Sequence, residues 1–209
     1  MKFSIVMPTL NRGERILPSV QSVLSQDYPD FELIIKDGGD PVASILPRDK
    51  RIHYIHCSDT GLGNALNQGY RAATGDVVVE ANDDDFMAPG ALRYVSEHLG
   101  TAMWGYGLQT ESTGRVWGCP WDWDHHLREN IVPQPCAYWR RELFDLLGPW
   151  EEEYDLAADY DWWFRLGQLF EPVFWDVVLA TYNWWEGQLS VTALAKQQEH
   201  AGIVRRRYA

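Results

Sequence analysis

The amino-acid sequence predicts an α/β protein with a mixed, mostly parallel sheet flanked by helices. Through the first hundred residues, short runs of β-branched and aromatic residues alternate with apolar patterns of helical period. Strands separated by helices imply crossover connections, which join parallel strands. The 209 residues, 45% of them apolar, suit one domain with a sizeable core.

The first half is expected to contain four strands and two helices. The strands are predicted at residues 3–7, 31–35, 51–57 and 77–79. One helix is predicted over residues 14–26, and Pro18 places its start close upstream, because proline is tolerated only in a first turn. A second helix follows from Leu62 to Ala73 and ends before Gly75.

The second half is less regular in its pattern. Residues 103–118 are expected to form strands with glycine turns, and residues 119–135 a loop rich in Trp, Asp, His and Pro. The remaining predicted elements are helices at 140–147 and 159–169, a strand at 173–183 and a final helix near 191–206. No repeat, low-complexity linker or charge run marks a second domain.

Charge and composition narrow the partners that we expect. The net charge of -12 argues against binding to nucleic-acid phosphates. No stretch approaches the roughly 18 apolar residues of a transmembrane segment. Three widely spaced cysteines indicate a reducing, cytoplasmic setting. The basic run Arg205-Arg206-Arg207 is compatible with peripheral contact to anionic lipid or with simple solvation, and solvation is favoured.

The run Asn82-Asp83-Asp84-Asp85 comes directly after the predicted strand at 77–79. Ligands of parallel sheets bind beyond the carboxyl ends of the strands, where packed carboxylates repel one another unless a cation neutralises them. Carboxylate oxygens suit Mg²⁺ or Mn²⁺, and such a cation bridges a diphosphate. The alternative is a solvated turn that caps a helix starting near Pro89. The position after a buried strand favours the cation site.

The segment Asp159-Tyr160-Asp161-Trp162-Trp163 is a candidate for a general base beside an apolar floor. A carboxylate at a helix start can take the proton from an acceptor hydroxyl. Asp is also a favoured helix cap, and the aromatic residues can belong to the core. The segment by itself therefore favours the structural interpretation.

Polar residues also follow the first two predicted strands. Pro8-Thr9-Leu10-Asn11-Arg12 comes after the first strand and Asp37-Gly38-Gly39-Asp40 after the second. Both lie where a nucleotide base and ribose would bind in such a sheet. Neither is a glycine-rich phosphate loop, and each one alone is more often an ordinary turn.

In this order along the chain, the segments resemble the inverting family 2 glycosyltransferases of the GT-A fold. The resemblance covers SIVMPTLNR, SVLSQDYPDFELIIKDGG, GLGNALNQGYRAATGDVVVEANDDDFMAPGAL and IVPQPCAYWRRELFDLLGPWEEEYDLAADYDWWFRL. It implies one GT-A domain over residues 1–209, with a nucleotide-sugar-binding half at 1–100 and an acceptor-binding half at 101–209.

The resemblance also implies roles for individual residues. Asp84 matches the last acid of the family's D-x-D metal motif, Asn82 stands at the first position as in an N-x-D-D variant, and Asp85 supports them. Asp159 matches the catalytic base, with Asp161 in reserve. Contacts to the nucleotide sugar are implied for Pro8, Thr9, Asn11, Arg12, Asp37, Asn67 and Asp83.

The implied activity is metal-dependent, inverting transfer of a hexosyl group from a nucleotide-diphosphate sugar to an acceptor hydroxyl. Mn²⁺ or Mg²⁺ is the expected cofactor, a UDP-sugar the favoured donor, and a glycan or lipid-linked oligosaccharide the acceptor. Family members often place a metal-binding histidine near the C-terminal strand, where this chain offers only Glu186. The alternatives are a catalytically inactive nucleotide-sugar or carbohydrate-binding module and, less favoured, a hydrolase.

Overall fold

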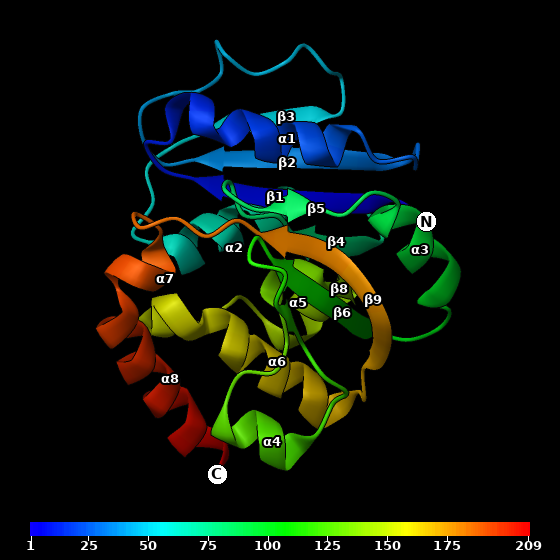
Figure 1. Cartoon of the computed structure of the whole chain (residues 1–209), viewed down its shortest axis with the longest axis vertical. Coiled ribbons are helices and arrows are strands. Elements are labelled where there is room, and N and C mark those ends of the chain that lie inside the picture. Colours follow the sequence, from blue (N-terminus) through cyan, green and yellow to red (C-terminus); the bar gives the residue numbers. More distant parts are fainter.

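The computed structural model of the protein describes residues 1–209, with one mixed sheet at its centre (Figure 1). The sheet has nine strands in the order β3-β2-β1-β4-β8-β6-β9-β5, and β7 pairs with β6 outside that path. Helices cover both faces. The predicted α/β class with a mixed, helix-flanked sheet is confirmed.

The first half forms the parallel part of the sheet, as predicted. Its strands are β1 (Phe3–Thr9), β2 (Phe31–Asp37), β3 (Ile52–His56) and β4 (Val77–Glu80). All neighbouring pairs among them are parallel. A 3₁₀ turn at Gly13–Ile16 leads into helix α1 (Leu17–Leu24), whose first turn contains Pro18, and helix α2 spans Leu62–Ala72.

The rest of the chain, from residue 86 onward, adds three antiparallel pairings to the path of the sheet, one parallel pairing between β6 and β9, and most of the helices. Two short strands belong to it, β5 (Phe86–Met87) and β7 (Val116–Trp117), beside the longer β6 (Trp104–Glu111), β8 (Ala137–Arg140) and β9 (Val173–Tyr182). Its helices are α3 (Ala91–His98), α4 (Trp123–Arg128), α5 (Glu142–Leu147), α6 (Ala158–Leu169), α7 (Leu189–Thr192) and α8 (Leu194–Tyr208).

Three predictions for the second half need correction. The predicted loop at 119–135 contains α4, which begins where the Asp122 carboxylate accepts a hydrogen bond from the backbone N–H of His125. The predicted helix at 140–147 starts only at Glu142, because the residues before it form β8 between β4 and β6. The single final helix near 191–206 is divided into α7 and α8.

Two hydrophobic cores fill the space between the sheet and its helices. One contains apolar residues of α1 and α3, and the other contains those of α2, α5 and α6. The second core buries Trp104, Trp139, Trp150, Trp162 and Trp163 almost completely. Much of the high tryptophan content therefore serves packing, and the aromatic floor expected beside Asp159 is part of this core.

None of the helices combines the length and the apolar character that crossing a bilayer requires.

Candidate active site

A cavity of about 830 Å³ opens at the carboxyl ends of β1 and β4. Both halves of the chain line it, because β9 and α6 bring the second half against the strand ends of the first. Its walls contain many of the predicted site residues: Pro8, Thr9, Arg12, Asn82, Asp83, Asp84, Asp85 and Asp159. The cavity therefore lies at the edge of the sheet at which the sequence predicts a site.

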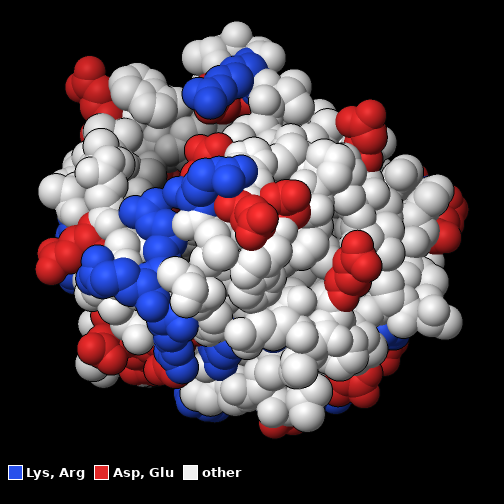
Figure 2. Space-filling model, turned by 90° about the horizontal axis from the view of Figure 1, so that it is seen from below, with Lys and Arg blue, Asp and Glu red and all other residues white.

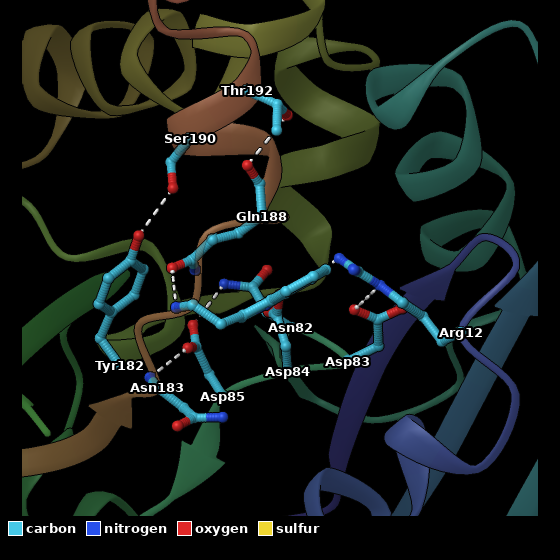
Figure 3. A network of polar contacts seen from close by, with 11 residues as sticks. Arg12, Asn82, Asp83, Asp84, Asp85, Tyr182, Asn183, Gln188, Ser190 and Thr192 are labelled. Atoms are coloured by element: carbon cyan, nitrogen blue, oxygen red, sulfur yellow. Dashed lines mark hydrogen bonds and ion pairs between the residues drawn. The ribbon is translucent and has the colours of Figure 1, made fainter.

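Arg12 links two of the three consecutive aspartates (Figure 3). Its Nε lies 3.0 and 3.1 Å from the two carboxylate oxygens of Asp83, and its Nη2 lies 3.2 Å from Oδ2 of Asp84. Burial raises the pKa of Asp83 to about 6, although the Arg12 charge opposes that shift. Arg12 thus neutralises charge that would otherwise be crowded at the end of β4.

Asp85 has a different set of partners. Its Oδ2 accepts from the Asn82 side-chain amide at 2.8 Å, and its Oδ1 accepts from the backbone N–H of Asn183 at 3.0 Å. Burial raises the pKa of Asp85 to about 6. Asn82 therefore supports a neighbouring carboxylate, and the pair ties the loop after β9 to the acidic run (Figure 3).

Trp185 also contacts the acidic run, although no pattern in the sequence predicts this contact. Its indole Nε1 donates to Oδ2 of Asp84 at 2.9 Å. The guanidinium groups of Arg12 and Arg15 lie 5.0 and 5.1 Å from its ring centroid, within cation–π distance. Glu186, the expected replacement for the family's histidine, is exposed, and the neighbouring indole contacts the metal-motif aspartate instead.

The residues present fit a cation that is shared with a ligand. No group of three or more His, Cys, Asp and Glu side chains is placed to hold a metal by itself. Mg²⁺ is commonly bound by one or two carboxylates together with substrate phosphates. Asp84 lines the cavity and keeps part of its side chain exposed, so its oxygens suit that mode once Arg12 and Trp185 give way.

Asp159 and Asp161, both in the first turn of α6, point to different surroundings. Asp159 lines the cavity and accepts a hydrogen bond from the Asn130 side-chain amide at 2.9 Å. Burial raises its pKa to about 6. Asp161 is fully buried outside the cavity lining, with Arg165 Nε at 3.0 Å and the Tyr208 hydroxyl at 2.8 Å. The geometry favours Asp159 over Asp161 as a base.

Asp37 and Asn67, two of the predicted nucleotide contacts, are hydrogen-bonded within the protein and do not line the cavity. Asp37 is fully buried, and its carboxylate accepts from the backbone N–H groups of Gly39 and Val42 and from the Tyr54 hydroxyl. Asn67 is equally buried and exchanges two hydrogen bonds of 2.9 Å with the backbone of Trp150. Asp37 therefore stabilises the loop after β2, and Asn67 links α2 to Trp150 in the second half of the chain.

Asn11 lies beside the main cavity. It contributes with Arg12 to a neighbouring hollow of about 350 Å³, and its Oδ1 accepts from the backbone N–H of Asp40 at 2.9 Å. Its φ of 56° places the backbone in the left-handed region that Asn tolerates. The loops after β1 and β2 are therefore held together at the edge where the sequence predicts base and ribose binding.

Two amide side chains of the cavity also escaped the sequence analysis. Asn130 holds Asp159, and Gln134 donates at 2.6 Å to Oε2 of Glu80, which is buried in β4. Both lie in a segment rich in proline and aromatic residues that predicts only a loop. Their position was decided by β8, which returns the chain to the edge of β4.

Known glycosyltransferases resemble this chain in sequence. Residues 4–103 match Glycosyl transferase family 2. A "PGL/p-HBAD biosynthesis glycosyltransferase" of Mycobacterium tuberculosis is 29% identical over 211 residues, which cover 93% of this chain and 81% of the relative.

Solved structures share the fold at low sequence identity. Residues 1–349 of TarS from S. aureus, in complex with UDP, give a TM-score of 0.70 at 18% identity, covering 98% of this chain and 65% of that one. The mannosyltransferase PcManGT from Pyrobaculum calidifontis, in complex with GDP-Man and Mn²⁺, gives 0.70 at 19% identity, covering 98% and 62%. The chain spans only 37% of a longer TarS chain.

The fold is therefore GT-A-like, with a cavity at the carboxyl edge of its parallel strands. Within it, residues 4–103 carry the sequence pattern of Glycosyl transferase family 2, and the chain resembles the nucleotide-sugar glycosyltransferases of that family in both sequence and fold.

Proposed function

We propose that the protein is a metal-dependent, inverting glycosyltransferase that uses a nucleotide-diphosphate sugar. The single observation that carries this proposal is the arrangement of two acidic sites in one cavity. Asp84 stands at the end of β4, and Asp159 stands at the start of α6, each with its carboxyl group in the cavity wall. Such a cavity can hold a donor at one carboxylate and an acceptor at the other.

Asp84 is the residue that would hold Mn²⁺ or Mg²⁺ together with the donor diphosphate. A bound cation supplies charge stabilisation to the departing diphosphate. Arg12 already lies against Asp83 and Asp84, so its guanidinium is placed to balance charge at the same point. Thr9 and Pro8 line the cavity next to it and would bind the nucleotide side of the donor.

Asp159 is the proposed base for the acceptor hydroxyl. Its pKa of about 6 keeps it mostly ionised at neutral pH, yet closer to the operating pH than an ordinary aspartate. The Asn130 amide fixes the orientation of the carboxylate without neutralising it. As Asp159 takes the proton, the acceptor oxygen would bond to the anomeric carbon on one face while the bond to the diphosphate breaks on the opposite face, which gives transfer with inversion in a single displacement.

The substrates are proposed from the relatives. The solved relatives bind UDP and GDP-Man, and we favour a UDP-sugar as donor. The mycobacterial relative is named for PGL/p-HBAD biosynthesis, and we propose a glycan or lipid-linked acceptor at the cytoplasmic side of the cell.

The test is a thermal-shift screen of the purified protein against UDP-, GDP-, dTDP- and CMP-sugars, each with Mn²⁺, Mg²⁺ or EDTA. A ligand at a hundredfold excess over its Kd stabilises a protein by roughly 2.7 kcal/mol. We expect a shift for one nucleotide that disappears with EDTA and in Asp84→Asn. The matched control is Asp124→Asn, an exposed aspartate of α4 away from the cavity lining.

Two results would contradict the proposal in different ways. A donor-induced thermal shift that persists in EDTA and in Asp84→Asn would show that donor binding requires neither a metal nor Asp84. Donor binding without turnover over a broad panel of glycan and lipid-linked acceptors would instead indicate an inactive nucleotide-sugar-binding module.

A further inference from the structure

Exposed apolar side chains concentrate in one short segment of the chain. Ten large hydrophobic residues of the molecule are exposed, and four of them lie within the eleven residues 184–194. They are Trp184 (53% exposed), Leu189 (44%), Val191 (40%) and Leu194 (49%). Single exposed apolar residues are ordinary, but a cluster of this kind marks an interaction surface.

This segment lies at the mouth of the active-site cavity. Leu189 lines the cavity on one side, and Leu10, 59% exposed, lines it at the end of β1. The Trp185 ring, set against Arg12 and Arg15, brings the segment next to the β1 end. The exposed apolar residues therefore border the opening through which an acceptor would enter.

Hydrogen bonds hold the segment in place, so its apolar side chains are presented by an ordered scaffold (Figure 3). The hydroxyls of Tyr182 and Ser190 are 2.7 Å apart, and the Gln188 Oε1 accepts from the backbone N–H of Trp185 at 2.8 Å. Asn183 is bound to Asp85 in the acidic run. These polar groups thus hold the segment against the protein, while its large apolar side chains are exposed beside the exposed Glu186 and Thr192.

A basic cluster lies at the other end of helix α8, which begins at Leu194. Helix α8 continues from Leu194 for 15 residues, about 22 Å, and ends in three consecutive arginines. Arg205 donates to the backbone carbonyl of Arg128, the last residue of α4, at 2.9 Å. Figure 2 shows basic side chains gathered in a band on the face that carries this end of α8. In a chain of net charge -12, such a band is a local exception.

We propose that this surface docks onto a lipid bilayer that contains anionic lipids. We call it the docking face and define it by Leu10, Trp184, Leu189, Val191 and Leu194 at the cavity mouth and by Arg128, Arg205 and Arg206 at the far end of α8. Peripheral binding strengthens with the apolar area inserted and with attraction between basic groups and anionic headgroups. Tryptophan is enriched at that depth because its ring is apolar and its N–H is polar. The docking face offers both contributions, and α8 connects them, with Leu194 at its start and Arg205 and Arg206 near its end.

Docking in this orientation places the cavity mouth against the bilayer. An acceptor whose lipid tail stays in the membrane can then present its hydroxyl to Asp159 without leaving the bilayer. The assignment of a lipid-linked acceptor rests on the proposed function, whereas the docking itself does not.

The experiment is co-sedimentation of the full chain with vesicles of phosphatidylcholine alone or with about 30% phosphatidylglycerol. The apolar variant is Trp184→Ser/Val191→Ser/Leu194→Ser, none of which lines the cavity. Its matched control is Val116→Ser/Leu146→Ser/Leu169→Ser, three similarly exposed residues elsewhere (52%, 62% and 55%). The charge variant is Arg128→Gln/Arg206→Gln.

We expect the wild-type protein and the matched control to bind anionic vesicles equally. The apolar variant should lose at least about fivefold in binding, and the charge variant about threefold, with a further loss for the wild type in high salt. Donor-induced thermal shifts should be retained in every variant, so a failure of docking is distinguishable from a failure of the donor site.

Three outcomes would overturn the inference. The first is that the wild-type protein does not sediment with anionic vesicles. The second is that the apolar variant binds these vesicles as well as its control does. Alternatively, sedimentation velocity without lipid would show a dimer that the apolar variant converts to a monomer, in which case a second copy of the chain covers the docking face.

Discussion

The two acidic sites of the cavity differ in how their charge is balanced. At the end of β4, Arg12 contacts both Asp83 and Asp84, and Trp185 adds an N–H to Asp84. At the start of α6, Asp159 has the neutral amide of Asn130 as its side-chain hydrogen-bond partner. The carboxylates of Asp83 and Asp84 are thus paired with the positively charged side chain of Arg12, whereas the carboxylate of Asp159 is hydrogen-bonded to a neutral amide.

This difference suits two kinds of chemistry. A site that binds a divalent cation needs one or two carboxylates, and carboxylates crowded together are stable only with balancing positive charge. A base must accept a proton, and a cation directly beside it would lower its affinity for that proton. Burial without a cationic partner instead raises the pKa of Asp159 to about 6.

The largest effect is expected for Asp159→Asn. The amide keeps the size of the side chain but cannot accept the acceptor proton, so the transfer rate should fall by about 10²- to 10⁴-fold. Donor binding, measured by thermal shift, should stay within about twofold of wild type, because a substitution that keeps the size of the side chain usually has a small effect. Activity within tenfold of wild type would remove Asp159 from the base role.

The second effect concerns stability. Asp161→Asn leaves Arg165 and Arg207 without the buried carboxylate that they share. We expect the free energy of unfolding to fall by about 3 kcal/mol, as is usual when one partner of a buried ion pair is removed. Chemical denaturation measures it, and the folded variant should retain transfer. If Asp161→Asn were inactive but as stable as wild type, Asp161 would be the base and Asp159 would have the structural role.

A third prediction follows from the pKa of Asp159. Because the ionised carboxylate is the active form and its pKa is about 6, the transfer rate at saturating donor should fall about tenfold per pH unit below 6. Above that pH the rate should level off. Donor binding measured at each pH separates this titration from those of Asp83 and Asp85. A flat profile between pH 5 and 7 would contradict the assignment.

The smallest effect is expected for Trp185→Phe. The phenyl ring keeps the contact with Arg12 and Arg15, but Asp84 loses one competing hydrogen-bond donor. The Mn²⁺ concentration that supports half-maximal donor binding should fall by about two- to fivefold, the value of one modest hydrogen bond. A requirement for more Mn²⁺ would show that the indole supports the metal site instead.

The parallel half of the fold was predictable because its signals are local. The buried strand β4 begins with three consecutive valines, and α2 shows a clear helical stripe that ends before a glycine. Strand β8 has only four residues, and it exists because both of its neighbours supply hydrogen bonds. Such pairing between distant segments leaves no periodic pattern in the sequence.

The site was predicted to the same extent and for the same reason. The acidic run follows a recognisable strand, so its place at the sheet edge could be inferred. The buried partners of Asp37 and Asn67 come from Tyr54 and Trp150, and only the folded chain brings them together. Trp185 reaches Asp84 across 101 positions of sequence, which no local pattern could indicate.

The order of strands in the sheet also limits how such a chain can be recombined. The strands of the second half are not appended after those of the first: β8 occupies the free edge of β4, while β5, from the middle of the chain, completes the far side of β9. A chimera with everything after residue 100 taken from another enzyme would have to reproduce the pairings of β4 with β8 and of β5 with β9. It would also have to reproduce the two hydrogen bonds between Asn67 and the backbone of Trp150. Exchange of acceptor specificity should therefore succeed by grafting cavity loops, whereas exchange of whole halves would leave strand edges unmatched.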